Sequence, residues 1–135
     1  MKEKFRFLEH TGDFKFKVSG VTLNEIFENT VLAISAYLSP DKKVKSVKGK
    51  TLEVSGKDYE SLLYNFMDEI LFLLDSKGFV PAKASVTMRG FNLKAELYGD
   101  SAKNYAIQAI KAATYAEMYI KETKSGWEAQ AVLDV

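Results

Sequence analysis

Acidic groups near the two ends of the chain offer the clearest candidate chemistry. Asp13 closes a polar cluster at residues 9–13, between two apolar stretches where packing alone would favour a neutral turn. Asp134 and the carboxylate of Val135 close an apolar, alternating stretch. If the last strand pairs beside the first two, Asp13 meets both in an all-oxygen, strongly negative pocket. Carboxylates held this closely repel one another unless a cation binds, and hard oxygen ligands select calcium, magnesium or manganese over zinc.

Other chemistry is restricted by residue counts. The chain has no cysteine and a single histidine, His10, which excludes disulfides, thiolate metal sites and sites that need two imidazoles. The Gly-Lys pairs at 49–50 and 56–57 lack the glycine spacing of a phosphate-binding loop. A small phosphoesterase using Asp13, Asp134 and His10 is an alternative, but two-metal phosphoryl chemistry usually needs more carboxylates.

Composition indicates one soluble domain spanning residues 1–135. At this length, 47% hydrophobic residues suffice for a core without covalent cross-links. Nineteen basic and eighteen acidic residues give a net charge of +1, so no field of one sign favours bulk nucleic-acid or membrane binding. No apolar run approaches the ~18 residues of a membrane span. We therefore expect a cytoplasmic monomer that makes no contact with membranes.

Lysines supply almost all of the positive charge, because only Arg6 and Arg89 are arginines. Five lysines lie within residues 42–50, which we interpret as a solvated loop that enters an edge strand, where lysine also opposes aggregation. The alternative is an RNA-binding chaperone that uses these lysines with exposed aromatics such as Tyr98 and Tyr105. A steep salt dependence of RNA affinity would support that alternative.

Two amphipathic helices are predicted. The first covers about 23–37, after a capping box formed by Thr22 and Glu25, and ends before Pro40. The second, up to Gly78, has the strongest apolar periodicity in the chain. Phe72 and Leu73 widen its apolar stripe, so we expect this helix to be buried on more than one side.

The remaining segments predict mainly strands. Apolar and polar residues alternate over 14–19, 52–54, 86–97 and 118–133, with hairpin turns near 89–90 and 124–126. Alanines and isoleucines between 101 and 115 favour a short third helix. The predicted fold class is α+β, a single compact domain of mostly antiparallel strands with two main helices packed on one face.

Five segments together resemble the archease family. They are FLEHTGD (7–13), LNEIFEN (23–29), LLYNFMDEILF (62–72), IKAATY (110–115) and VLDV (132–135). The resemblance covers essentially the whole chain in order, and the fold it implies is a compact α+β one built around a strand–helix–strand–strand unit.

The resemblance implies an accessory protein rather than an enzyme. Archease-like proteins activate the GTP-dependent RNA ligase of tRNA splicing and RNA repair, promoting guanylylation of the ligase and multiple turnover. The implied metal ligands are Asp13, Asp134 and Val135, and the implied activation contact is Lys111. The expected cofactor is a divalent cation, calcium in the first instance, with magnesium or manganese as alternatives. His10 is a candidate for supporting the ligands, and tRNA is an indirect partner.

Three departures from the family pattern stand out. Gly12 occupies a position where alanine is usual, and a small-for-small change should keep the loop but loosen it. Ala116 replaces a histidine present in many members, so we assign it no role. The alanine-rich stretch 99–108 lacks the family's usual histidine and bears on the geometry around Lys111.

Overall fold

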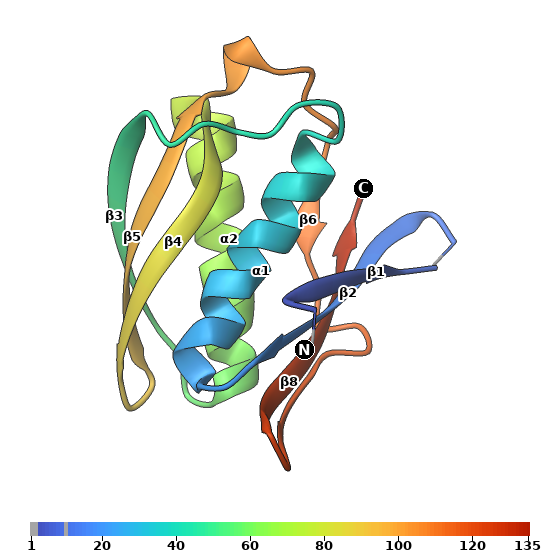
Figure 1. The fold of residues 1–135 in the computed structure, drawn as a ribbon, viewed down its shortest axis with the longest axis vertical. Coiled ribbons are helices and arrows are strands. Elements are labelled where there is room, and N and C mark those ends of the chain that lie inside the picture. The colour runs from blue at the N-terminus through green and yellow to red at the C-terminus, as the bar shows by residue number, and fades with distance from the viewer. Residues whose placement is uncertain (1–2, 10) are drawn as a thin grey trace.

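Two antiparallel sheets enclose two helices in the computed structural model, which describes residues 3–9 and 11–135 (Figure 1). The first sheet has the order β1-β2-β8-β6, with β7 also paired to β8, and the second has the order β3-β5-β4. The strands are β1 (Phe5–Leu8), β2 (Asp13–Gly20), β3 (Lys48–Ser55), β4 (Phe79–Arg89), β5 (Asn92–Ser101), β6 (Ala112–Ala113), β7 (Tyr119–Thr123) and β8 (Gly126–Asp134).

Helix α1 (Leu23–Leu38) begins and ends where the sequence predicts, within one residue. The Thr22 hydroxyl accepts a hydrogen bond from the Glu25 amide at 3.3 Å. The Glu25 carboxylate, however, accepts from the amide of Val21 at 2.8 Å, one residue before the position that the capping box predicts. Both bonds satisfy amides at the helix entrance.

Helix α2 (Tyr59–Lys77) supplies five of the twelve largest fully buried side chains, more than any other element. The Asp58 carboxylate accepts from the Ser61 amide at 2.7 Å, and Gly78 ends the helix in the left-handed conformation at φ 60°. Leu63, Phe66 and Ile70 are buried, as expected. The prediction for Phe72 is wrong, because its side chain is 57% exposed on a side of the helix that neither sheet covers.

Both helices contact both sheets. Helix α1 packs on β4 of the second sheet and on β1, β2 and β8 of the first, whereas α2 contacts β3 and β4 on one side and β6 and β7 on the other. The helices therefore cover one face of each sheet and leave the outer faces open. The α+β prediction of a single domain with mostly antiparallel strands is confirmed. No helix in the described part of the chain is long and apolar enough to cross a membrane.

The short helix predicted for 101–115 is wrong. Only Ala102–Asn104 forms a single 3-10 turn, and the chain then runs extended to β6. This segment connects the two sheets across the end of α1, where the Gln108 amide donates to the Leu38 carbonyl at 2.8 Å and Ile110 enters the core. Tertiary contacts thus override the helix propensity of its alanines.

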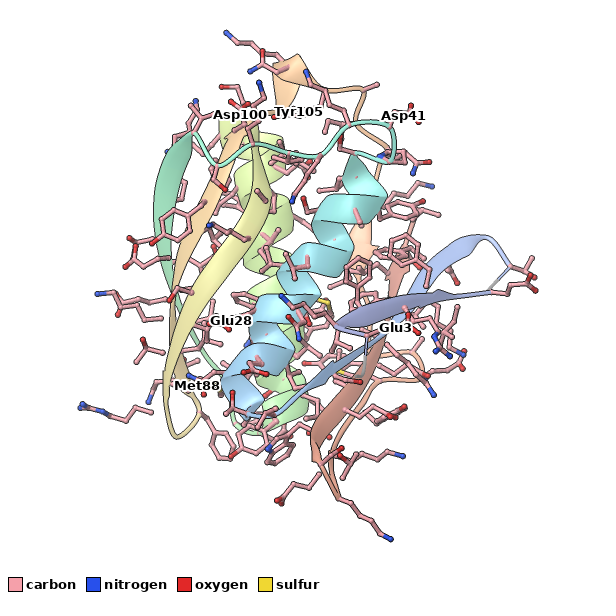
Figure 2. All side chains as sticks on the ribbon, viewed as in Figure 1. Glu3, Glu28, Asp41, Met88, Asp100 and Tyr105 are labelled. Atoms are coloured by element: carbon pink, nitrogen blue, oxygen red, sulfur yellow. The ribbon has the colours of Figure 1, made fainter. Side chains whose placement is uncertain are left out.

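The connection is fastened by a polar network around Asp100, at one end of the molecule (Figure 2). The Tyr105 hydroxyl donates to the Asp100 carboxylate at 2.8 Å and accepts from the amide of Lys45 at 2.9 Å. Asp100 also accepts from the Ser101 amide at 2.7 Å. The Tyr105 hydrogen bond and then the Ser101 amide hold the pKa of Asp100 below its usual value.

Tyr105→Phe is expected to lower the melting temperature at neutral pH and to make stability less sensitive to acid. A carboxyl whose pKa is depressed by folding adds stability above its ordinary pKa, and this stability is lost as the pH falls through the folded value. The variant removes the hydrogen bond that contributes most to the lowered pKa of Asp100. Its free energy of unfolding should therefore decrease less steeply below about pH 4 than that of the wild type. Thermal melts across this range test it, with Tyr98→Phe as control. Parallel pH curves would contradict it.

Candidate functional site

Asp13 and Asp134 are direct cross-strand neighbours. Strand β8 lies beside β2 in the antiparallel direction, and its last residue, Asp134, is in register with the first residue of β2, Asp13. Cross-strand partners project on the same face, with Cβ atoms about 4.5–5.5 Å apart. The expectation that the last strand brings these two acidic residues together is therefore confirmed. Their role as metal ligands stays a prediction.

Like charges in directly opposed positions destabilise a sheet. Asp13 is half-buried and Asp134 exposed, at the edge where β2 begins and β8 ends. The donor set is all oxygen, which suits a hard divalent cation. Across residues 3–9 and 11–135 no three acidic or imidazole side chains form a metal-binding group. The two carboxylates thus need further oxygen ligands, and Val135, the residue after β8, is the predicted one.

Lys111 lies next to the acidic pair. Its amide donates to the Asp134 carbonyl at 2.7 Å, and the following residue, Ala112, is in register with Asp134. The Lys111 side chain is exposed. The structure therefore brings Asp13, Asp134, Val135 and Lys111 to one edge of the first sheet, although more than ninety positions separate the first from the others. His10 lies outside the described residues.

The strand beside β8 is interrupted between β6 and β7. Residues 114–118 span a gap opposite only Ala131 and Val132, so they loop out of the sheet. The loop is fixed by the Thr114 hydroxyl, which donates to the Val132 carbonyl at 2.7 Å, and by the Gln130 amide group, which donates to the Glu117 carbonyl at 2.8 Å. Glu117 adopts a left-handed φ of 51°.

An ion pair ties this loop to the strand that carries Asp13. The Lys15 ammonium lies 2.9 Å from the Glu117 carboxylate, and only 17% of the Lys15 side chain is exposed. Lys15 is two residues from Asp13 and therefore on the same face of β2. Because side chains alternate between the faces of a strand, the sequence predicts that Lys15 and Asp13 share a face. Nothing in the sequence indicates that Glu117, 102 residues away, is the partner of Lys15.

On its other side the loop rests on α2. The rings of Tyr115 and Tyr64 stack with centroids 4.4 Å apart and planes inclined by 5°. Partial burial, and then the nearby Tyr64 and Asp58, raise the pKa of the Tyr115 hydroxyl above its ordinary value. Tyr115 thus stays neutral at physiological pH and anchors the segment that follows Lys111.

Nearly the whole chain, including the segments that carry Asp13, Lys111 and Asp134, matches one protein family. Residues 5–135 match the model of the Archease protein family (MTH1598/TM1083). The chain belongs to the archease family. Archease from Pyrococcus abyssi is 36% identical over 98% of this chain and 99% of its own, and that of Thermococcus kodakarensis is 35% identical over the same shares.

Solved archease structures share the fold. The solution structure of Methanobacterium thermoautotrophicum protein 1598 superposes with a TM-score of 0.80 at 26% identity, covering 98% of this chain and 99% of that one. A crystal structure from Thermotoga maritima, described as an archease and possible chaperone, gives a TM-score of 0.63 at 20% identity, covering 100% and 98%. The second likeness concerns the fold alone.

Gly12 occupies a position where the resemblance leads us to expect alanine, and its backbone conformation explains why glycine suits it. Its φ is +76°, in the left-handed region that glycine adopts without steric cost. The expectation that glycine merely loosens this loop is therefore incomplete, because here it also relieves backbone strain just before Asp13.

Proposed function

We propose that this archease is a divalent-cation-binding accessory protein that activates the GTP-dependent RNA ligase of tRNA splicing and RNA repair. It promotes guanylylation of the ligase and multiple turnover, and is not itself the catalyst. It acts in the cytoplasm as a monomer, with tRNA as an indirect partner. The observation that supports this most directly is the register of Asp13 with Asp134, beside Lys111. The family resemblance assigns the two aspartates to metal binding and the lysine to activation.

The donor set suits a cation that is shared with a partner. Calcium takes six to eight oxygen ligands, whereas this edge offers two carboxylates and Val135. Water or oxygen atoms of the ligase or of its phosphate-bearing substrate would complete the coordination. A site that is complete only in the complex would couple metal binding to docking. When bound, the cation supplies positive charge at this edge of the first sheet.

The protein's own residues fix the approach to this edge. The Lys15–Glu117 ion pair and the Tyr64–Tyr115 stack hold the loop at 114–118, and the hydrogen bond to Asp134 holds the main chain of Lys111. The exposed Lys111 side chain is then free to contact a phosphate or a carboxylate of the partner. A protonated lysine cannot ligate a cation, so metal binding and partner contact fall to different side chains.

A ligation time course with the ligase at a concentration well below that of the RNA tests the proposal. We expect product to exceed one equivalent of ligase only when this protein is present. Omitting the divalent cation, or adding a chelator, should abolish the difference. Identical progress curves with and without the protein would refute the proposal.

Lys111→Gln is expected to reduce ligase activation by about tenfold or more, the typical effect of losing one hydrogen bond to a charged group. Stabilisation of the isolated protein by calcium should stay unchanged, because the main-chain bond to Asp134 does not depend on the side chain. Lys103→Gln, at an exposed lysine in the connection between the sheets, is the matched control. A Lys111 variant that loses calcium-induced stabilisation would show instead that the lysine braces the acidic pair.

A further inference from the structure

The outer face of the second sheet is open to solvent and bears side chains aligned in rows. Cross-strand partners on β3, β5 and β4 share this face, and the intervening residues point to the helices. The row nearest the lysine-rich loop contains Gly49, Tyr98 and Lys83, all exposed. This face lies on the side of the helices away from the sheet that carries Asp13 (Figure 1).

Tyr98 presents its ring from the middle strand. The side chain is 39% exposed, and one neighbour in its row, Gly49, has no side chain to cover it. The Lys83 ammonium lies 5.8 Å from the ring centroid on the other side. An accessible ring with an adjacent cation is the arrangement on which a nucleobase stacks while its phosphate meets the positive charge.

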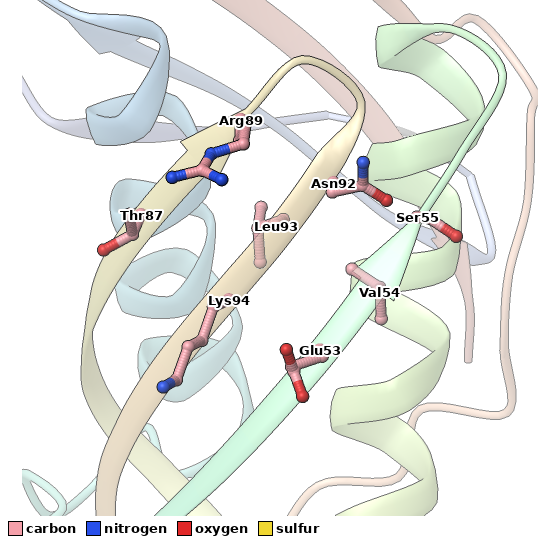
Figure 3. A pocket seen from close by; sticks show the side chains of 8 residues that line it. All are labelled: Glu53, Val54, Ser55, Thr87, Arg89, Asn92, Leu93 and Lys94. Atoms are coloured by element: carbon pink, nitrogen blue, oxygen red, sulfur yellow. The ribbon is translucent and has the colours of Figure 1, made fainter.

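Farther along the same face lies a shallow hollow of about 410 Å³ (Figure 3). Arg89, Lys94 and Asn92 line it, with Glu53 opposite. Six residues of extended strand separate Asn92 from Tyr98, which is roughly 20 Å. Cationic groups therefore occur at both ends of one continuous surface. The acidic Glu96 lies between them on the same face, where its carboxylate accepts from the hydroxyl of its cross-strand partner Thr51 at 2.7 Å.

The lysine-rich loop at 41–47 borders this face and is firmly held. Val44 is buried in the core, the Lys45 amide binds the Tyr105 hydroxyl, and the Val47 amide donates to the carbonyl of Gly99, the residue after Tyr98, at 2.8 Å. Because the main chain of the loop is already ordered, phosphate binding by its exposed lysines restricts their side chains but costs little further main-chain freedom. Tyr105 itself is half-buried and bound to Asp100, so it is not the exposed aromatic expected from the sequence.

We propose that this face binds a single-stranded polynucleotide, with one base stacked on Tyr98 and phosphates near Lys83, Lys94, Arg89 and the lysines of the loop. A flat sheet face offers no element that could enter a duplex groove, whereas an unpaired base can reach the ring. This inference is independent of the proposed metal site and of ligase activation, because it concerns the protein alone and the opposite sheet.

Fluorescence anisotropy with a short labelled single-stranded RNA tests the stacking. Tyr98→Leu should weaken the affinity about tenfold, and Tyr98→Phe, which keeps the ring, should bind as the wild type does. Phe72→Leu is the control for an exposed aromatic elsewhere, on α2. Single-stranded DNA should bind similarly, because stacking and phosphate contacts do not require the 2′-hydroxyl.

The charges are tested by salt titration of the same complex. Lys83→Gln and Lys94→Gln should each weaken binding and reduce the slope of log K against log salt by about one. Glu53→Gln should tighten binding, because it removes the acidic side chain that faces the hollow. Lys124→Gln, in the β7–β8 turn of the other sheet, is the control.

Four outcomes would overturn the inference. They are no measurable binding of the single strand, Tyr98→Leu with unchanged affinity, equal affinity for a duplex of the same length, and equally effective competition by poly-glutamate. The last would identify the face as a docking surface for an acidic protein. None of these results would bear on ligase activation, which is measured with the ligase present.

Discussion

Asp13→Asn is expected to remove the proposed stabilisation of the protein by divalent cations and, with it, the proposed activation of the ligase. At a hundredfold excess over Kd, a bound ion stabilises the folded state by about 2.7 kcal/mol, which is roughly 10 °C in melting temperature for a domain of this size. Without the ion, the variant lacks one of two directly opposed charges, so the repulsion between the two carboxylates is gone.

Thermal melts with calcium, with manganese and with a chelator measure this effect. Asp41→Asn, at an exposed aspartate in the lysine-rich loop, is the matched control and should keep the full shift. Asp134→Asn and the double variant complete a cycle: if both carboxylates hold one ion, the second substitution should cost little once the first is made. A full calcium shift in Asp13→Asn would eliminate the candidate site.

Gly99→Ala is expected to destabilise the fold strongly. A Cβ atom at this position would lie 2.0 Å from the Val80 carbonyl oxygen and 2.9 Å from the Pro81 Cα, both main-chain atoms of the neighbouring strand β4. Strand β4 shifts its register between Pro81 and Lys83, next to this contact. Relief would require moving β4, which begins with the buried Phe79 and Val80, so we expect a loss of about 3 kcal/mol or more.

Gly49→Ala provides the matched control. Gly49 lies in the adjacent strand β3, and its Cβ would meet only the Leu97 carbonyl oxygen, at 3.6 Å, which is ordinary contact. A change within about 0.5 kcal/mol is expected there. Denaturant unfolding of the two variants compares them, and a Gly99→Ala protein as stable as Gly49→Ala would show that β4 and β5 do not approach so closely.

Local patterns in the sequence account for the helices and hairpins. The apolar period of α2, the stop at Gly78 and the turn at Gly90 all depend on residues close to one another in the chain. The pairing of Asp13 with Asp134 could be anticipated as well, because the last apolar strand ends on an acidic residue just as the second strand begins on one.

Features made by distant segments could not be predicted. The alanines after Ser101 favour a helix locally, but the chain there must cross from one sheet to the other, and Gln108 and Ile110 are bound along the way. Nor does the sequence show which acidic residue Lys15 meets, or that Phe72 faces solvent. These outcomes depend on which surfaces the completed fold leaves uncovered.

The pairing of β2 with β8 also has a consequence for the order of folding. The two strands join the start of the chain to its end, with roughly 120 residues closed into one loop, and such non-local contacts carry the highest entropic cost and tend to form late. Asp13 and Asp134 become neighbours only when this contact is made. A cation that bridges them would therefore bind only the fully folded protein and would slow its unfolding. Nascent or partly folded molecules would then not activate the ligase.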